Sequence, residues 1–284
     1  MRPPTLLAGL RLLPIGLHLL YGSLQAGLLF PFAGPRWRQL RIQRWSQQLL
    51  VLLGIRIESA TDPARLDGGL LVGNHISFID IFVINALLPS TFVAKSDVAH
   101  WPLIGRLARH AGTVFIERGN RRAAHSTRQQ MLAALGAGRR LAVFPEGTTT
   151  RGERVLPFHA ALFQSAIDAA VPIHALALSY RDSGGNPSAA PAYVDDIGII
   201  DCLISVLAAG GLVARIELAA SFPSPLPDRR HLAHSARQSI VTALARAPDA
   251  VPASRCRDVD PRNREGNPLQ DPGQPPRNEA AMRQ

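Results

Sequence analysis

Residues 69–80 read Gly69-Leu70-Leu71-Val72-Gly73-Asn74-His75-Ile76-Ser77-Phe78-Ile79-Asp80. The apolar run at the start of this stretch is typical of a strand that is buried on both faces, as in parallel sheets. Ligands usually bind at the carboxyl ends of such strands. His75 follows the strand and has Asp80 within reach, so it is a candidate general base. Alternatively, His75 and Asp80 form a hydrogen-bonded pair that has only a structural role.

Beyond residue 58, short apolar runs alternate with helical patterns, which predicts an α/β fold with a mostly parallel central sheet flanked by helices. The predicted strands are Gly69–Val72, Thr91–Ala94, Thr113–Ile116, Leu141–Phe144, Ile173–Ser179 and Ala214–Ala219. The predicted helices are Ile79–Leu88, Val98–His110, Ala123–Ala137, Ala160–Ala169 and Arg230–Ala245. The Gly-, Pro- and Ser-rich segment Arg181–Asp196 is expected to form an exposed loop.

The N-terminal region predicts a membrane anchor. No charged residue occurs from Leu12 to Pro35, and this length suffices for a hydrocarbon core of ~30 Å. The segment can span the bilayer or lie in one leaflet, and a buried core helix is a third interpretation. Arginines are denser after the segment than before it, which places the downstream domain in the cytoplasm if the segment spans. Trp37–Ile57 follows as a basic amphipathic helix that lies either in the headgroup plane or half-buried in the protein.

Composition restricts the class of partner. The net charge is +10, with Lys95 the only lysine among 31 basic residues, so an anionic partner is expected. Arginines beside the apolar N-terminus favour membrane lipid, and no helix-turn-helix, zinc or RNA motif favours nucleic acid. The two cysteines, Cys202 and Cys256, have neither disulfide-framework nor zinc-site spacing, so we expect a reducing compartment and no metal.

The chain is therefore divided into three regions. Residues 1–57 are predicted to be membrane-anchoring helices, and residues 58–247 a catalytic domain. Residues 248–284 form a Pro- and Arg-rich segment without apolar periodicity, which we predict to be a disordered tail.

Three more motifs lie at the ends of predicted strands: Gly112-Thr-Val-Phe-Ile-Glu-Arg118, Phe144-Pro-Glu-Gly-Thr-Thr-Thr-Arg151 and Val171-Pro-Ile-His174. Each alone is common, but with residues 74–80 they stand in the order of the four blocks of the glycerolipid acyltransferase superfamily. The chain resembles this family, typified by bacterial 1-acylglycerol-3-phosphate acyltransferases, over about residues 50 to 220. The connecting segments 92–98, 100–112 and 155–163 also resemble members assigned to lyso-ornithine lipid acylation.

The resemblance implies the chemistry of the site. His75 would remove the proton from an acceptor hydroxyl, and Asp80 would orient the imidazole ring. The hydroxyl would attack a thioester directly, without an acyl-enzyme, metal or redox cofactor. Because five residues of regular helix would turn His75 and Asp80 about 140° apart, we expect the chain to turn at residues 76–78 before the helix begins.

The resemblance also implies an acceptor site in which Arg118 holds the phosphate. The other candidates for this site are Glu146, Gly147, Thr148, Lys95 and Asn74. Glu146 beside a phosphate is explicable if it aims an arginine or accepts a hydrogen bond from a substrate hydroxyl. Lys95 is equally well interpreted as a solvated residue at the end of its strand.

One segment departs from the family. Many members have Phe-Lys-x-Gly after the third block, whereas this chain has Phe158-His159-Ala160-Ala161. A permanent cation is thereby replaced by a titrating one, so the acceptor head group can differ from a simple phosphomonoester.

The function expected from the resemblance is that of an inner-membrane O-acyltransferase with its catalytic domain on the cytoplasmic face. It would move a fatty acyl group from acyl-CoA or acyl carrier protein to a lysophospholipid, with lysophosphatidic acid as the leading acceptor. A lyso-ornithine lipid is the alternative acceptor. A non-catalytic membrane lipid-binding protein is the alternative from another class.

Overall fold

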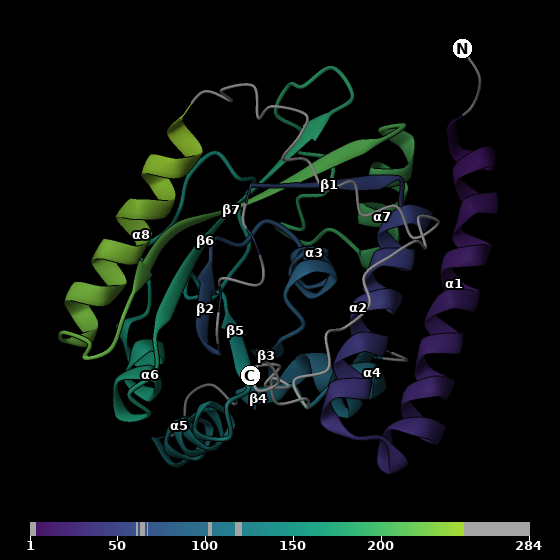
Figure 1. Cartoon of the computed structure of the whole chain (residues 1–284). Coiled ribbons are helices and arrows are strands. Elements are labelled where there is room, and N and C mark those ends of the chain that lie inside the picture. The colour runs from purple at the N-terminus through teal and green to yellow at the C-terminus, as the bar shows by residue number, and fades with distance from the viewer. Residues whose placement is uncertain are drawn as a thin grey trace, which may run out of the picture.

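The computed structural model describes residues 4–60, 62, 66, 68–101, 104–116 and 121–246. Arg118, Cys256 and the predicted tail lie outside the described residues. The described chain contains one seven-stranded sheet with helices on both faces (Figure 1).

The strands are β1 (Ile55–Ser59), β2 (Gly69–Gly73), β3 (Thr91–Lys95), β4 (Val114–Ile116), β5 (Arg140–Val143), β6 (Ile173–Asp182) and β7 (Leu212–Phe222). They lie in the order β1-β7-β6-β2-β5-β3-β4. All neighbours are parallel except β6 and β7, which pair antiparallel. The predicted mostly parallel sheet is therefore confirmed, with β2 in its centre.

The helices of the sheet domain are α3 (Asp80–Leu87), α4 (Ile104–His110), α5 (Arg121–Gly136), α6 (Gln164–Asp168), α7 (Ile199–Ala208) and α8 (Arg229–Ala245). Short 3-10 turns η3 (Ser96–His100) and η4 (Ala160–Phe163) precede α4 and α6. The N-terminal part consists of α1 (Pro4–Leu29), the 3-10 turn η1 (Phe30–Phe32) and α2 (Pro35–Leu52).

Two apolar cores lie on the two faces of the sheet. Alternating side chains of β2 divide between them: Leu71 packs with residues of α2, α3 and α7, whereas Leu70 and Val72 pack with residues of α5, α6 and α8. All five residues of β2 are buried. Burial on both faces explains the continuous apolar run in the sequence.

The chain differs from the sequence prediction at the end of α2. The predicted helix to Ile57 ends at Leu52, and Ile55–Ser59 forms β1 instead. Gly54 has a φ of +70°, a conformation that terminates helices, and the side chains of Ile55 and Ile57 are buried while Arg56 is exposed. This alternation has the period of a strand. Helix α7 was not predicted, and β6 extends three residues beyond its predicted end at Ser179.

Helices α1 and α2 form a hairpin beside the sheet domain. His18 and Trp45 stack with ring centroids 5.0 Å apart, and the side-chain nitrogen of each donates to the backbone carbonyl of the other, at 3.0 and 3.1 Å. Helix α1 contacts α2, α4 and α7 and so forms an outer layer over helices (Figure 1).

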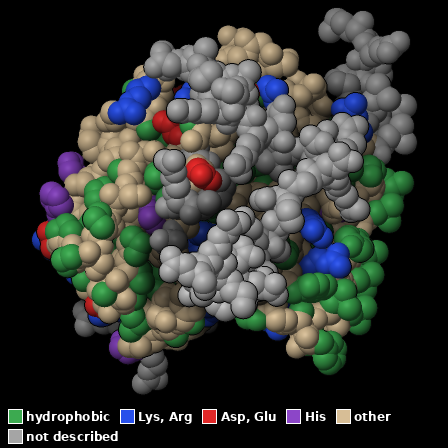
Figure 2. Space-filling model, viewed as in Figure 1, with side chains coloured by type: hydrophobic (Ala, Val, Ile, Leu, Met, Phe, Trp, Pro, Cys, Tyr) green, Lys and Arg blue, Asp and Glu red, His purple; other side chains and the backbone are tan. Residues whose placement is uncertain are grey.

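The outward side of α1 is apolar. Figure 2 shows hydrophobic side chains gathered along the right-hand edge of the molecule, where α1 lies. From residue 11 onward, where the side chains are described, the exposed large hydrophobic residues of α1 and η1 are Leu13, Leu17, Leu20, Tyr21, Leu24, Leu28, Leu29 and Phe32. Residues 11–32 form one helical stretch that is long and apolar enough to cross a membrane, by length and composition alone.

Candidate active site

The site begins where β2 ends. The last pair of the β2–β6 ladder joins Gly73 to Leu176, and the Asn74 side chain then continues the pairing. Its amide nitrogen donates to the Leu178 carbonyl at 2.9 Å, and its oxygen accepts from the Leu178 N–H at 2.8 Å. Asn74 is 1% exposed. This buried amide therefore fixes the chain next to His75 and is not directed at solvent.

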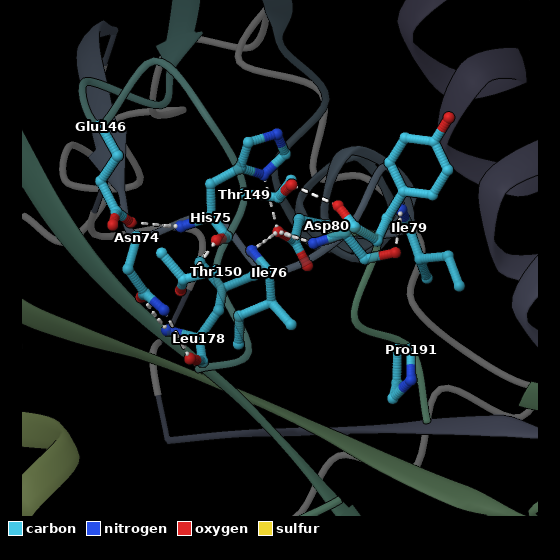
Figure 3. A network of polar contacts seen from close by, with 12 residues as sticks. Asn74, His75, Ile76, Ile79, Asp80, Glu146, Thr149, Thr150, Leu178 and Pro191 are labelled. Carbon is cyan, nitrogen blue, oxygen red and sulfur yellow. Dashed lines mark hydrogen bonds and ion pairs between the residues drawn. The ribbon is translucent and has the colours of Figure 1, made fainter. Parts of the chain in front are cut away.

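His75 and Asp80 are brought together as predicted. Nδ1 of His75 lies 2.9 Å from Oδ2 of Asp80, and this oxygen also accepts the backbone N–H groups of Ile76 at 2.7 Å and Ser77 at 3.0 Å (Figure 3). The chain turns at residues 76–79, and α3 begins at Asp80, so the expected turn is confirmed. Because a carboxylate accepts, Nδ1 carries the hydrogen and Nε2 keeps its lone pair.

The exposure of the two side chains differs. The side chain of His75 is 19% exposed, whereas that of Asp80 is fully buried. The ring of His75 stacks on Phe144 at 3.9 Å between centroids, with an interplanar angle of 4°. One face and one nitrogen of the imidazole are therefore fixed by the protein, and the remaining edge can meet a substrate.

Glu146 supports the backbone of this turn. Its Oε1 accepts the N–H of His75 at 2.8 Å, and its Oε2 accepts the N–H of Leu156 at 2.7 Å. The residue is 5% exposed. Burial raises the pKa of the Glu146 carboxyl, although the two backbone N–H groups act in the opposite direction. Both carboxylate oxygens are thus occupied by backbone groups of the protein itself.

The loop after β5 wraps around the same turn. Gly147 has a φ of +71°, and the chain then returns so that the Thr150 N–H donates to the His75 carbonyl at 2.9 Å. Thr149 donates its hydroxyl to the carbonyl of Tyr193. Thr148 between them is exposed. The loop brings Glu146 and Thr150 to the backbone of His75 and leaves Thr148 toward solvent.

Of the two basic candidates, the structure describes only Lys95, which lies farther along the sheet. Lys95 is exposed at the carboxyl end of β3, which is separated from β2 by β5. Arg118 follows β4 in the sequence and lies outside the described residues. The described contacts therefore place Asn74 and Glu146 at the His75 turn, with Gly147 next to Glu146 in the loop, and leave Lys95 and Thr148 at the surface.

Two contacts of the site were not predicted from the sequence. The hydroxyl of Tyr180 donates to Oδ1 of Asp80 at 2.7 Å, from a strand about a hundred residues away along the chain. Cys202 of α7 is buried, and its thiol contacts the Pro191 carbonyl at 3.4 Å. Burial raises the pKa of the Cys202 thiol, and the side chain packs in the interior at 1% exposure. Within the described residues, no group of three or more His, Cys, Asp and Glu side chains could hold a metal ion.

An apolar cavity of about 120 Å³ lies beside the site, among α1, α2, α3, β3 and α4. Its walls include Leu19, Ala26, Trp45, Phe82, Phe92 and Ala108. The ring of Phe92 lies 6.1 Å from the ring of Phe144, which in turn stacks on His75. Two aromatic rings therefore connect the cavity wall to the imidazole.

Comparisons with known proteins agree with these features. A family model described as "Acyltransferase" matches residues 55–179. The chain is 35% identical to the 1-acyl-sn-glycerol-3-phosphate acyltransferase of Neisseria meningitidis, over 74% of this chain and 83% of that protein. It is 37% identical to the lyso-ornithine lipid O-acyltransferase of Pseudomonas aeruginosa, over 73% of this chain and 79% of that protein.

A solved structure has the same fold. The 1-acyl-sn-glycerophosphate (LPA) acyltransferase of Thermotoga maritima superposes with a TM-score of 0.52 at 18% identity, covering 84% of this chain and 99% of that one. Residues 55–179, which the family model matches, include the His75–Asp80 pair. The chain therefore belongs to the acyltransferase family.

Proposed function

We propose that this acyltransferase moves a fatty acyl group from acyl-CoA or acyl carrier protein to the free hydroxyl of 1-acylglycerol-3-phosphate, giving phosphatidic acid. The observation that carries the proposal is the 2.9 Å contact between His75 Nδ1 and Asp80. It directs the lone pair of Nε2 toward the exposed edge of the ring, at the carboxyl end of a central strand. A base in this position can activate a hydroxyl.

The reaction follows from this geometry. Nε2 of His75 takes the proton of the acceptor hydroxyl while the hydroxyl oxygen bonds to the thioester carbonyl carbon. The tetrahedral intermediate collapses, the carbon–sulfur bond breaks, and the departing thiolate takes the proton from His75. Asp80 stabilises the imidazolium that forms between these steps. The protein ends in its starting state, and one ester replaces one thioester.

The apolar cavity supports a fatty acyl substrate. Its walls are mostly apolar, although residues such as Arg41 and Asn85 also line it, and it adjoins His75 through the rings of Phe92 and Phe144. Each methylene that enters such a site contributes about 0.8 kcal/mol. We assign the hydrocarbon chain of the donor to this cavity.

The surface candidates are assigned to the acceptor head group. Lys95 and Thr148 are exposed, and Arg118 follows a neighbouring strand end in the sequence. A phosphate suits these residues because guanidinium, ammonium and hydroxyl groups all donate hydrogen bonds. Asn74 and Glu146 shape the walls of the site, since their side chains bond to the protein backbone, and Gly147 allows the loop to turn through its positive φ.

A lyso-ornithine lipid is the second candidate acceptor. The identity to the Pseudomonas aeruginosa protein, 37%, is close to the identity to the Neisseria meningitidis protein, 35%. His159 stands where many family members have lysine, and its side chain is exposed. An imidazole in place of an ammonium group is compatible with a head group that carries one positive and one negative charge.

The hairpin of α1 and α2 supports a membrane location. Helix α1 packs on α2, α4 and α7, and its opposite side exposes a stripe of leucines such as Leu13, Leu17 and Leu24. A helix attached along its length to the domain suits insertion into one leaflet better than a crossing. We propose that α1 lies in the inner leaflet of the cytoplasmic membrane, with the catalytic domain on the cytoplasmic face.

The acceptor is tested with the full-length protein in phospholipid vesicles. The donor is either labelled acyl-CoA or acyl carrier protein that bears the same labelled acyl group. Each donor is supplied with lysophosphatidic acid or with lyso-ornithine lipid, and the His75→Ala variant is the control. Product from lysophosphatidic acid at the higher kcat/KM supports the proposal. Preference for lyso-ornithine lipid selects the second candidate. Lipid binding without product from either acceptor overturns both and leaves a non-catalytic lipid-binding protein.

The depth of α1 is tested separately by accessibility labelling. A cysteine is placed at residue 5 in a Cys256→Ser protein, in which the remaining Cys202 is buried. An impermeant thiol reagent should label it from the cytoplasmic side of sealed inverted vesicles. Labelling from the opposite side alone would show that the helix crosses the bilayer.

A further inference from the structure

Strand β6 extends past the end of β2 and makes two contacts with residues 74–80, which we call the catalytic turn. The ladder between the two strands ends at Gly73 and Leu176. Beyond it, the Leu178 backbone holds the Asn74 side chain, and the hydroxyl of Tyr180 reaches Oδ1 of Asp80 at 2.7 Å. The first and last residues of the segment from Asn74 to Asp80 are thus held by the same strand.

Tyr180 occupies the oxygen of Asp80 that the catalytic turn leaves open. Oδ2 receives His75, Ile76 and Ser77, whereas the recorded contact of Oδ1 is with Tyr180. Tyr180 is 3% exposed and Asp80 is fully buried. A carboxylate in this setting depends on donors from the protein, because water does not replace them.

The surroundings keep Tyr180 as a donor. Burial first, and then the charge of Asp80, raise the pKa of Tyr180 well above its ordinary value. The other titratable groups that act on Asp80 or His75 are Glu146 and Cys202. Neither makes a recorded hydrogen bond to Oδ1, so Tyr180 is the donor for that oxygen within the described part of the chain.

We propose that Tyr180 is a positioning residue for acyl transfer, which fixes the Asp80 carboxylate and moderates the charge that Asp80 presents to His75. The inference rests on the proposed role of His75 as general base. A donor on Oδ1 prevents the carboxylate from rotating and exchanging its oxygens. It also withdraws electron density, so that the carboxylate stabilises the imidazolium less than it otherwise would.

Removing this donor has two consequences of different kinds. The carboxylate loses its fixed orientation, which lowers kcat. It also presents a fuller negative charge to the imidazolium, which then persists to higher pH, so the acidic limb of the kcat profile moves to higher pH. Substrate binding does not involve Tyr180, so KM for donor and acceptor stays within about twofold.

The central experiment compares Tyr180→Phe with Tyr21→Phe in full-length protein in vesicles. Tyr21 lies on α1, where its hydroxyl accepts from Gln25, and its loss should leave activity unchanged. For Tyr180→Phe we expect kcat to fall on the order of tenfold, the value of one hydrogen bond to a charged group. The acidic limb should move to higher pH. A wild-type kcat, or a lower kcat with an unmoved limb, overturns the inference.

A double-mutant cycle tests whether Tyr180 acts through Asp80. In an Asp80→Asn background, Tyr180→Phe should lower kcat by less than threefold, because the carboxylate that it positions is absent. Equal fold losses in both backgrounds would mean a general structural role and would overturn the inference. If His75→Ala retains full activity, the general-base proposal itself fails, and that outcome differs from a failure confined to Tyr180.

A second probe covers the case in which Tyr180→Phe does not fold. The chain has three tyrosines, so 3-fluorotyrosine in a Tyr21→Phe/Tyr193→Phe protein labels position 180 alone. The more acidic phenol donates more strongly, and the acidic limb should move to lower pH than in the unlabelled double variant. An unmoved limb, or a shift to higher pH, overturns the inference.

Discussion

The catalytic turn and the apolar cavity adjoin each other and are built in opposite ways. The turn consists of short segments whose polar groups are paired one by one: Asp80 accepts four hydrogen bonds and Glu146 accepts two. The cavity has mostly apolar walls contributed by α1, η1, α2, α3, β3, η3 and α4. Hydrogen bonds are directional and fix atoms to within fractions of an ångström. Apolar contacts are non-directional, so an apolar cavity discriminates between ligands by their size. We therefore expect the turn to determine the rate of acyl transfer and the cavity to determine which acyl-chain lengths are accepted.

The largest effect is expected from His75→Ala. Loss of the general base should lower kcat by about 10²- to 10⁴-fold for acyl donors of every chain length. The matched control is His234→Ala, an exposed histidine on α8, which should retain wild-type turnover. A loss that varied with chain length would contradict the division between the two regions.

Glu146→Gln tests the turn without removing the base. The amide of glutamine supplies a donor where one backbone N–H requires an acceptor, so the backbone at His75 loses support. We expect kcat to fall by roughly 10- to 100-fold while KM for the acceptor changes little. Glu153→Gln, in the exposed part of the same loop, is the control. A large rise in the acceptor KM with unchanged kcat would instead indicate that Glu146 binds the head group.

Ala108→Phe tests the cavity alone. Ala108 lies on α4 and lines the cavity, so a phenyl ring there shortens the available space. If two methylenes are displaced, kcat/KM for long-chain donors should fall about tenfold, at 0.8 kcal/mol per methylene, and short-chain donors should be unaffected. Arg106→Phe, on the exposed side of the same helix, is the control. Equal losses for all donors would show that the cavity is not the acyl site.

Phe144→Leu addresses the connection between the two regions and should have the smallest effect. The ring stacks on His75 and faces Phe92. Aromatic pairs contribute about 0.5–1.5 kcal/mol beyond burial, so a loss of a few-fold in kcat is expected, with a slight change in chain-length preference. Steady-state kinetics with donors of graded length measure both quantities. A change in only one of them would mean that the two regions act independently.

Local patterns in the sequence predicted most of the sheet. The strands β2, β3, β5 and β6 were predicted from apolar runs, because strands in the interior of a parallel sheet are rich in apolar residues. The end of α2 was placed wrongly because Ile55 and Ile57 fit both a helical face and a strand, and the positive φ of Gly54 decided between them. Helix α7 was missed, although the stretch Ile199–Ala208 is apolar enough to read as a helix or a strand.

The site was predicted where its parts are close in sequence. His75, Asp80 and the turn between them follow from spacing and helix geometry. Tyr180 could not be found in this way, because its bond to Asp80 joins the end of β6 to the start of α3, a hundred residues apart along the chain. The hydrogen-bond partners of the Glu146 carboxylate could not be predicted either, because they depend on where the loop after β5 approaches the His75 backbone. The cavity requires side chains from many elements that are distant in sequence, which no local pattern indicates.

Helix α1 has two occupied sides in the proposed arrangement. Leu19 and Ala26 face the cavity, whereas Leu17 and Leu24 are exposed on the outside. Trimming an N-terminal hydrophobic helix is a common way to obtain a soluble enzyme for biochemical study. In this protein the shortened enzyme would lose one wall of its cavity. We therefore expect it to discriminate poorly between acyl donors of different chain length, even if its turnover is retained. Lipid composition measured with such a shortened enzyme would misrepresent the intact one.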